Sequence, residues 1–227
     1  MTGTRLVCLP FAGAGASFYR AWAGPADGLD VAPVPLPGRE RRIDEAPYLD
    51  MHVAADSVAA GLTGPIVLFG HSMGAVLAYE VARRLGAEVR HLVVSGSPPP
   101  GGRRQPRVSG LPDDEFLAAV ERMTGYRHPA FDHPEMRALL LPPLRADFRM
   151  DEDYVPVPAG RVAVPVTVVR GEDDELVGAA DAAAWRAFTT GEFATAELPG
   201  GHMYLAEDPG PLLRLIARTV HAGRSTC

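Results

Sequence analysis

The segment that most restricts how this chain can fold is PIVLFG, residues 65–70, an uncharged apolar run followed at once by a helical segment over residues 71–86. Gly86 is placed to end that helix as a C-cap. A short run that is apolar throughout is typical of a strand buried on both faces of a parallel sheet. Such a strand needs parallel neighbours beside it and helices above and below it.

The rest of the chain supplies those neighbours. Further strand candidates lie at residues 6–10, 31–36, 89–96, 164–171 and 193–198. Helical candidates lie at residues 17–23, with Ser17 as N-cap, and at 50–62, 179–188 and 211–221. Strands that alternate with helices predict βαβ units with right-handed crossovers. The prolines in 31–36 favour an edge strand. We therefore expect an α/β fold, a mostly parallel sheet flanked by helices.

Residues 97–158 interrupt the alternation. They open with the loop SPPPGGRRQPR and continue as two helical segments, 112–125 and 133–148, without a strand candidate. We interpret them as a helical lid inserted over the ligand end of the sheet. The whole chain, residues 1–227, is then one domain.

Composition excludes several classes of protein. A chain of 227 residues that is 47% hydrophobic can bury a core without a metal or a disulfide. The net charge of −6 argues against nucleic acid as the main partner. Because neither an apolar span nor a signal peptide is visible, we expect no membrane partner and a cytoplasmic protein. The sequence does not indicate an oligomeric state, and a monomer is the default expectation. Cys8 and Cys227 cannot form a disulfide framework, and no motif suggests a metal or another cofactor.

The segment Gly70-His71-Ser72-Met73-Gly74 fits the G-x-S-x-G pattern between a strand and a helix. A serine on so sharp a turn needs glycine two residues to either side, where a Cβ atom would clash. The N-terminus of the following helix stabilises negative charge near the hydroxyl. Ser72 is therefore the predicted nucleophile.

A serine of ordinary pKa needs a base, and an acid that orients the base. In α/β-hydrolases both follow the serine in the order acid, then histidine, each in a loop after a strand. His202 lies in a glycine turn after the last strand candidate, and the run Glu172-Asp173-Asp174-Glu175 follows the strand before it. We assign His202 as the base and favour Asp174 over Asp173 as the acid, because Val177 can anchor its loop.

The oxyanion of an acyl-transfer intermediate needs two backbone N–H groups. One should belong to Met73, directly after the nucleophile. The other should come from the glycine-rich turn after the first strand, where we favour Ala12 over Phe11. A phosphate-binding turn is the weaker interpretation, because G-x-G-x-x-G is absent.

Beyond these patterns, the chain resembles the type II thioesterases that accompany polyketide and nonribosomal peptide synthases, a branch of the α/β-hydrolases. The motifs that carry the resemblance are LPFAGAGASFYRAWA, LPGRER, LFGHSMGAVLAYEVARRL, VSGLPDDEFLAAV, PEMRALLLPPLRADFRMDEDY, GEDDELV, AWRAFT and LPGGHMYL. The resemblance implies hydrolysis of acyl groups from the phosphopantetheine arm of acyl or peptidyl carrier proteins. It places the family's triad on Ser72, Asp174 and His202, and its oxyanion amides on Met73 and Ala12.

Two departures from the family pattern concern the acyl chamber: GGHMY stands where GGHFF is usual, and MTGY replaces a paired glycine. The expected substrate channel beneath the lid is lined by Met123, Met136, Leu140 and Met203, with Leu139 and Leu141 as further candidates. Ordinary helix packing is an equally good interpretation of these lid residues. A flexible, Met-containing lining suits mixed acyl groups.

Two other functions remain open from the sequence. A carboxylesterase or lipase would use the same triad on oxygen esters, and a binding module on a hydrolase scaffold would not use it at all. Carrier proteins are acidic, so docking needs local cationic patches. The candidates are Arg39, Arg41, Arg42, Arg103, Arg104 and Arg107, although solvated loops explain these residues better.

Overall fold

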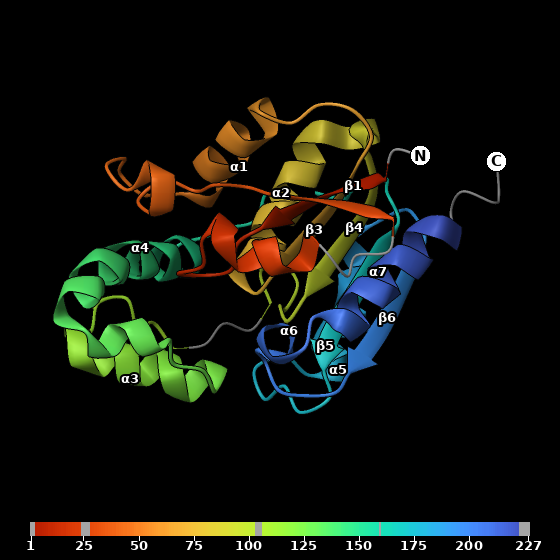
Figure 1. Ribbon diagram of the computed structural model, residues 1–227. Coiled ribbons are helices and arrows are strands. Elements are labelled where there is room, and N and C mark those ends of the chain that lie inside the picture. The colour runs from red at the N-terminus through yellow and green to blue at the C-terminus, as the bar shows by residue number, and fades with distance from the viewer. Residues whose placement is uncertain (1–2, 24–27, 103–105, 159, 223–227) are drawn as a thin grey trace.

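The computed structural model describes residues 3–23, 28–102, 106–158 and 160–222. Its centre is a six-stranded parallel sheet in the order β2-β1-β3-β4-β5-β6 (Figure 1). The strands are β1 (Thr4–Leu9), β2 (Leu29–Pro33), β3 (Ile66–His71), β4 (Val89–Ser95), β5 (Val166–Gly171) and β6 (Phe193–Leu198). The parallel sheet expected from the sequence is confirmed, and the proline-rich strand does lie at an edge.

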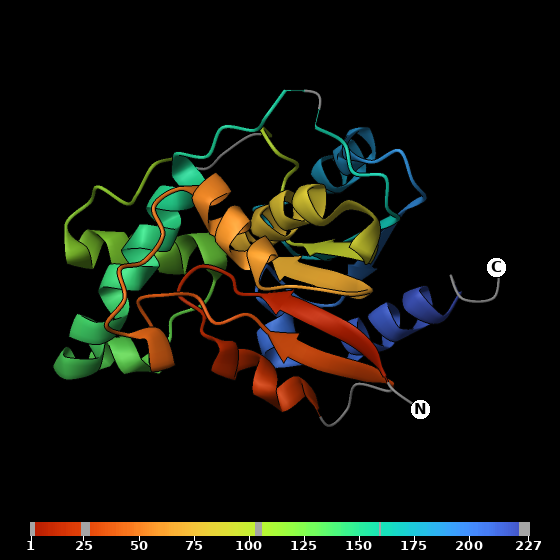
Figure 2. The ribbon, with the colours of Figure 1, turned by 90° about the horizontal axis from the view of Figure 1, so that it is seen from above.

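Helices cover both faces of the sheet, as Figure 2 shows. One face packs against α1 (Met51–Ala60), α2 (Met73–Leu85) and α5 (Ala179–Ala184), the last continued by η5 (Trp185–Phe188). The other face packs against η1 (Ala16–Ala23), α6 (Tyr204–Glu207) and α7 (Gly210–Ala222). Two short 3-10 turns, η2 (Glu40–Arg42) and η3 (Gly86–Glu88), have no buried residues and belong to neither layer. Strands buried from both sides explain the continuous apolar runs in the sequence.

Three local predictions needed correction. The segment after the first turn is a 3-10 helix that begins at Ala16, so Ser17 lies inside the helix and is not its N-cap. The Ser17 amide donates to Glu40. The edge strand begins at Leu29, two residues earlier than expected, and ends at Pro33. The short helix α6 has no signal of its own in the sequence. Asp50 caps α1 through the amides of residues 52 and 53.

Between β4 and β5 the described residues contain α3 (Asp113–Thr124), η4 (Pro129–Asp132) and α4 (Pro134–Glu152) and no sheet strand. In Figure 2 these green helices lie beyond the carboxyl ends of the strands. The last helix runs four residues past its expected end and has Pro142 and Pro143 in its interior. We refer to residues 97–158 as the insertion. Its position places helices over the edge of the sheet where active-site loops gather.

Candidate active site

Ser72 lies on a strained turn between β3 and α2. Its φ of 53° and ψ of −124° are outside the regions that a non-glycine residue normally adopts. A Cβ atom on Gly70 would lie 1.9 Å from the carbonyl oxygen of Gly74, and one on Gly74 would lie 2.5 Å from that of Leu9. The steric reason for the G-x-S-x-G spacing is therefore present in this chain. Such strain costs about 1–3 kcal/mol and is typical of functional turns.

His202 and Asp174 meet at the carboxyl edge of the sheet, from the loops after β6 and β5. The Nδ1 atom of His202 donates to Oδ2 of Asp174 at 3.0 Å. The other carboxylate oxygen of Asp174 accepts from the amides of Leu176 and Val177 at 2.9 and 3.2 Å. Asp173 is exposed instead. The structure thus brings Asp174, and not Asp173, against the histidine.

Ser72 and His202 line two cavities in common. The smaller cavity measures about 130 Å³ and the larger about 430 Å³. Met73 lies on the smaller one, whereas Phe11 and Ala12 lie on the larger. Because Ser72 and His202 border both cavities, the residues predicted to act as nucleophile, base and oxyanion donors lie around the same place in the structure.

Of the expected channel residues, Met123 lines the smaller cavity and Met136, Leu140 and Met203 line the larger. Leu139 is half exposed and Leu141 is buried in a separate apolar cluster, and neither lines these cavities. Within the insertion, five further apolar residues that the sequence interpretation missed line the larger cavity. They are Leu117, Val120, Phe131, Leu144 and Phe148. The i, i+4 spacing of residues 140, 144 and 148 on one helix face was the signal available for three of the cavity's residues.

His71, inside the serine turn, is fully buried beside the base. Its ring centroid lies 4.8 Å from that of His202. Its Nδ1 atom bonds the Ser95 hydroxyl at 2.9 Å, and that hydroxyl bonds the Tyr204 hydroxyl at 2.7 Å. Burial lowers the pKa of His71 well below its usual range, so that the ring stays neutral. The ring that packs on His202 is therefore uncharged.

The arginines proposed for docking divide into different environments. Arg39 is buried and paired with Asp147, so it cannot meet a partner protein, and that prediction is wrong. Arg42 pairs with Glu45. Arg107 is exposed and pairs with Asp153. Arg41 is exposed. Arg103 and Arg104 lie outside the described residues.

Other groups in the described part of the chain give no sign of metal chemistry. Its His, Cys, Asp and Glu side chains form no group of three that could hold an ion. Cys8 is buried as a free thiol, and burial raises its pKa far above the usual range. Cys227 lies outside the described residues. Among the described helices, none combines the length and apolar character needed to cross a bilayer.

A parallel sheet with a serine elbow after β3 and an Asp–His pair after its last strands defines an α/β-hydrolase fold. The Thioesterase domain family model matches residues 4–222, and the chain belongs to this family.

Among named relatives, a probable cadicidin biosynthesis thioesterase from Streptomyces griseus is 38% identical; the alignment covers 97% of this chain but only 63% of that protein. Thioesterase PikA5 from Streptomyces venezuelae is 34% identical, with 90% of this chain and 76% of the relative covered. Among solved structures, the type II thioesterase BorB from the borrelidin biosynthetic cluster is 35% identical. It superposes with a TM-score of 0.86 over 96% of this chain and 93% of its own.

Proposed function

We propose that this protein hydrolyses acyl thioesters on the phosphopantetheine arm of carrier proteins and so removes stalled or aberrant units in polyketide or nonribosomal peptide biosynthesis. Family membership supports thioester chemistry. The observation that carries the proposal is the buried Asp174–His202 pair beside Ser72, at the meeting point of two cavities.

In the proposed mechanism the Ser72 hydroxyl attacks the thioester carbonyl carbon while Nε2 of His202 takes its proton. Asp174 holds the imidazole with Nδ1 protonated, which leaves Nε2 free to act as the base. The tetrahedral oxyanion accepts hydrogen bonds from the amides of Met73 and Ala12. When the C–S bond breaks, the pantetheine sulfur receives the proton from His202. Water, deprotonated by His202, then releases the acid from the acyl-enzyme.

The larger of the two cavities suits the acyl chain of such a substrate. The larger cavity is of ordinary ligand size, and the insertion supplies most of its apolar side chains. We assign the acyl chain to it and regard the insertion as the lid that covers it. The proposed partner is an acyl or peptidyl carrier protein, met by a cytoplasmic monomer.

Mass spectrometry of acyl-loaded carrier proteins, before and after incubation with the enzyme, tests this function directly. The wild type is expected to return the carrier protein with the thiol of its phosphopantetheine arm free, and Ser72→Ala to lose activity by several orders of magnitude. An oxygen-ester panel measured in parallel identifies the alternative. Esters hydrolysed faster than carrier thioesters would indicate a carboxylesterase. No turnover of either substrate, together with no labelling of Ser72 by a fluorophosphonate, would indicate a binding module.

A further inference from the structure

A buried ion pair joins the insertion to the body of the protein. Arg39, in the loop after β2, donates to both carboxylate oxygens of Asp147 on α4, each at 2.7 Å. The two side chains are only 5% and 2% exposed. Burying such a pair costs so much desolvation that an apolar pair of similar volume is often equally stable. Stability alone therefore does not explain why an ion pair is buried at this position.

Each member of the pair also binds the glycine-rich turn that carries Ala12. The Oδ2 atom of Asp147 accepts from the Gly13 amide at 2.8 Å, and Arg39 donates to the Ala14 carbonyl at 3.0 Å. Gly13 has a φ of +77°, and a Cβ atom there would lie 2.7 Å from a methyl carbon of Leu144. The helix α4 thus contacts the turn twice at Gly13, through the Leu144 side chain and through the hydrogen bond to Asp147.

These contacts decide which amides of the turn remain available. The Gly13 amide is used by Asp147, and the Ala14 amide donates to the Phe11 carbonyl at 2.9 Å. The Phe11 carbonyl and the Ala12 N–H belong to one planar peptide unit and point in opposite directions. A carbonyl held inside the turn therefore directs the Ala12 N–H outward, on the side where Ala12 borders the larger cavity.

Glu40, the residue after Arg39, binds the last residue of the same turn, Ser17. Glu40 accepts a hydrogen bond from the Ser17 amide at 2.8 Å. Its φ of +50° is strained for a residue with a side chain. Adjacent residues of the LPGRER segment thus bond the turn at Ala14 and at Ser17, and Glu40 does so from a backbone conformation that is unfavourable by itself.

We propose that Arg39 and Asp147 are positioning residues that fix the Ala12 amide toward the oxyanion. The inference rests on the proposed function, because it assigns a role within the same acyl transfer. It makes the second half of α4 part of the support of the oxyanion hole, in addition to covering the cavity. The LPGRER and LPPLRAD motifs, far apart in the chain, then serve one purpose.

Three variants separate positioning from stability. Asp147→Leu removes the carboxylate and leaves Arg39 and the Gly13 amide without it. The double variant Arg39→Met/Asp147→Leu replaces the whole pair by apolar side chains, which restores folding but not the bonds to the turn. Asp147→Asn keeps one oxygen for the Gly13 amide.

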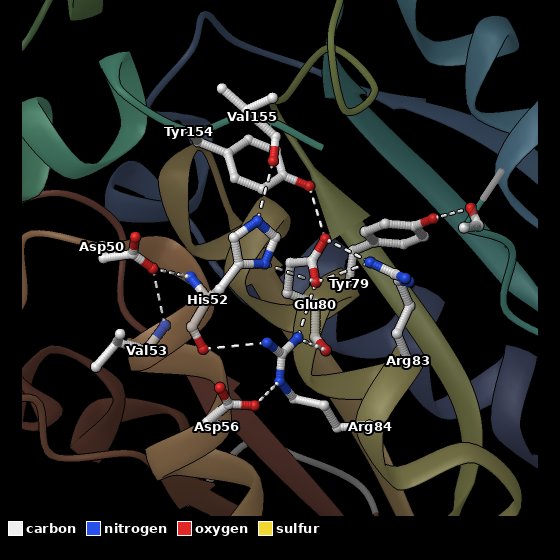
Figure 3. Close-up of polar contacts among 11 residues, drawn as sticks. Asp50, His52, Val53, Asp56, Tyr79, Glu80, Arg83, Arg84, Tyr154 and Val155 are labelled. Carbon is white, nitrogen blue, oxygen red and sulfur yellow. Dashed lines mark hydrogen bonds and ion pairs between the residues drawn. The ribbon is translucent and has the colours of Figure 1, made fainter. Parts of the chain in front are cut away.

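A matched control is Glu80→Gln. Glu80 is also a fully buried carboxylate, but it binds Arg83, Arg84 and the Tyr154 hydroxyl and none of the turn residues (Figure 3). Replacing Glu80 perturbs a similar buried network of charged groups that does not contact the glycine-rich turn carrying Ala12. A loss of activity that follows instability alone would appear in this variant too.

The readout compares two pantetheine-linked inhibitors. A trifluoromethyl ketone forms a hemiketal with Ser72 that places an oxyanion in the hole, whereas the corresponding thioether only fills the site. In the double variant we expect kcat and affinity for the ketone to fall together, about 10- to 100-fold. We expect KM and affinity for the thioether to change less than about twofold, because Arg39 is the only cavity-lining residue that is replaced and methionine keeps its apolar stem. Asp147→Asn should lose less than Asp147→Leu.

Unchanged kcat in the double variant would overturn the inference, and so would equal losses of affinity for both inhibitors. A Glu80→Gln variant with the same selective loss for the ketone would also contradict it. Failure of the proposed function is distinguishable, since it would show as wild-type enzyme inactive on carrier thioesters. The inhibitor comparison and an oxygen-ester substrate would still test Arg39 and Asp147 in that case.

Discussion

His202 donates a hydrogen bond from Nδ1 to Asp174 in a setting where neither side chain exceeds 4% exposure. Because the Asp174 carboxylate also accepts two backbone amides, it is held in place independently of the histidine. In the proposed mechanism this contact keeps the imidazole in the tautomer with Nδ1 protonated, which leaves Nε2 free to accept the proton of Ser72.

Replacing the acid tests that relationship. We expect Asp174→Asn to lower kcat by about 10³- to 10⁴-fold, because the amide no longer selects the reactive tautomer. Steady-state hydrolysis of an acyl-pantetheine thioester measures it. Asp173→Asn, one residue away and exposed, is the control and should stay within about twofold. A stronger effect at 173 than at 174 would reassign the acid.

The larger cavity predicts a change in chain-length preference. Leu140→Trp should fill part of its 430 Å³ and lower kcat/KM for long acyl chains at least tenfold, while acetyl and propionyl thioesters are hardly affected. Leu139→Trp is the matched control, because residue 139 is half exposed and does not line the cavity. Equal loss across all chain lengths in Leu140→Trp would place the acyl group elsewhere.

Stability should fall on mild acidification. Burial lowers the pKa of His91 to about 4, whereas in the unfolded chain it is about 6.5. Below pH 6.5 the unfolded state binds a proton that the folded state does not, so stability present above this pH is lost as the pH falls toward 4. His71 acts in the same direction.

Urea unfolding at pH 7.5 and 5.0 measures this loss, to which His91 contributes about 2 kcal/mol. His91→Gln can keep a hydrogen bond to Thr167. In this variant the difference in the free energy of unfolding between pH 7.5 and pH 5.0 should be smaller by that amount. The exposed His133, changed to Gln, should leave it unaltered. An unchanged difference in His91→Gln would show that His91 is not the group responsible.

The hydroxyl of Tyr204 should contribute to stability. It bonds Ser95, which in turn bonds His71, in a buried chain of polar groups. Tyr204→Phe restores the ring that is usual at this position of the family motif but leaves the Ser95 hydroxyl with one partner fewer. We expect a loss of about 1 kcal/mol in the free energy of unfolding, with kcat within about twofold. A large fall in kcat at unchanged stability would instead link Tyr204 to the reaction.

Local sequence patterns were sufficient to predict the geometry around the serine. Strands and helices follow from apolar periodicity, and the serine turn follows from the spacing of Gly70 and Gly74, because their close backbone contacts exclude any side chain. The order of acid and base along the chain limited the remaining partners to a few residues. Such features depend on neighbours in sequence, so a pattern can record them.

Tertiary structure decided what depends on residues far apart in the chain. Arg39 looked like a surface cation and is buried, because Asp147, 108 residues later, neutralises it. Helical spacing places Leu140 and Leu144 on one face of α4 and Leu139 on another, but only the packing of α4 against the turn at Gly13 decided that the first face lines a cavity. Long-range contacts of this kind have no periodicity in the sequence, and the oxyanion turn owes its support to them.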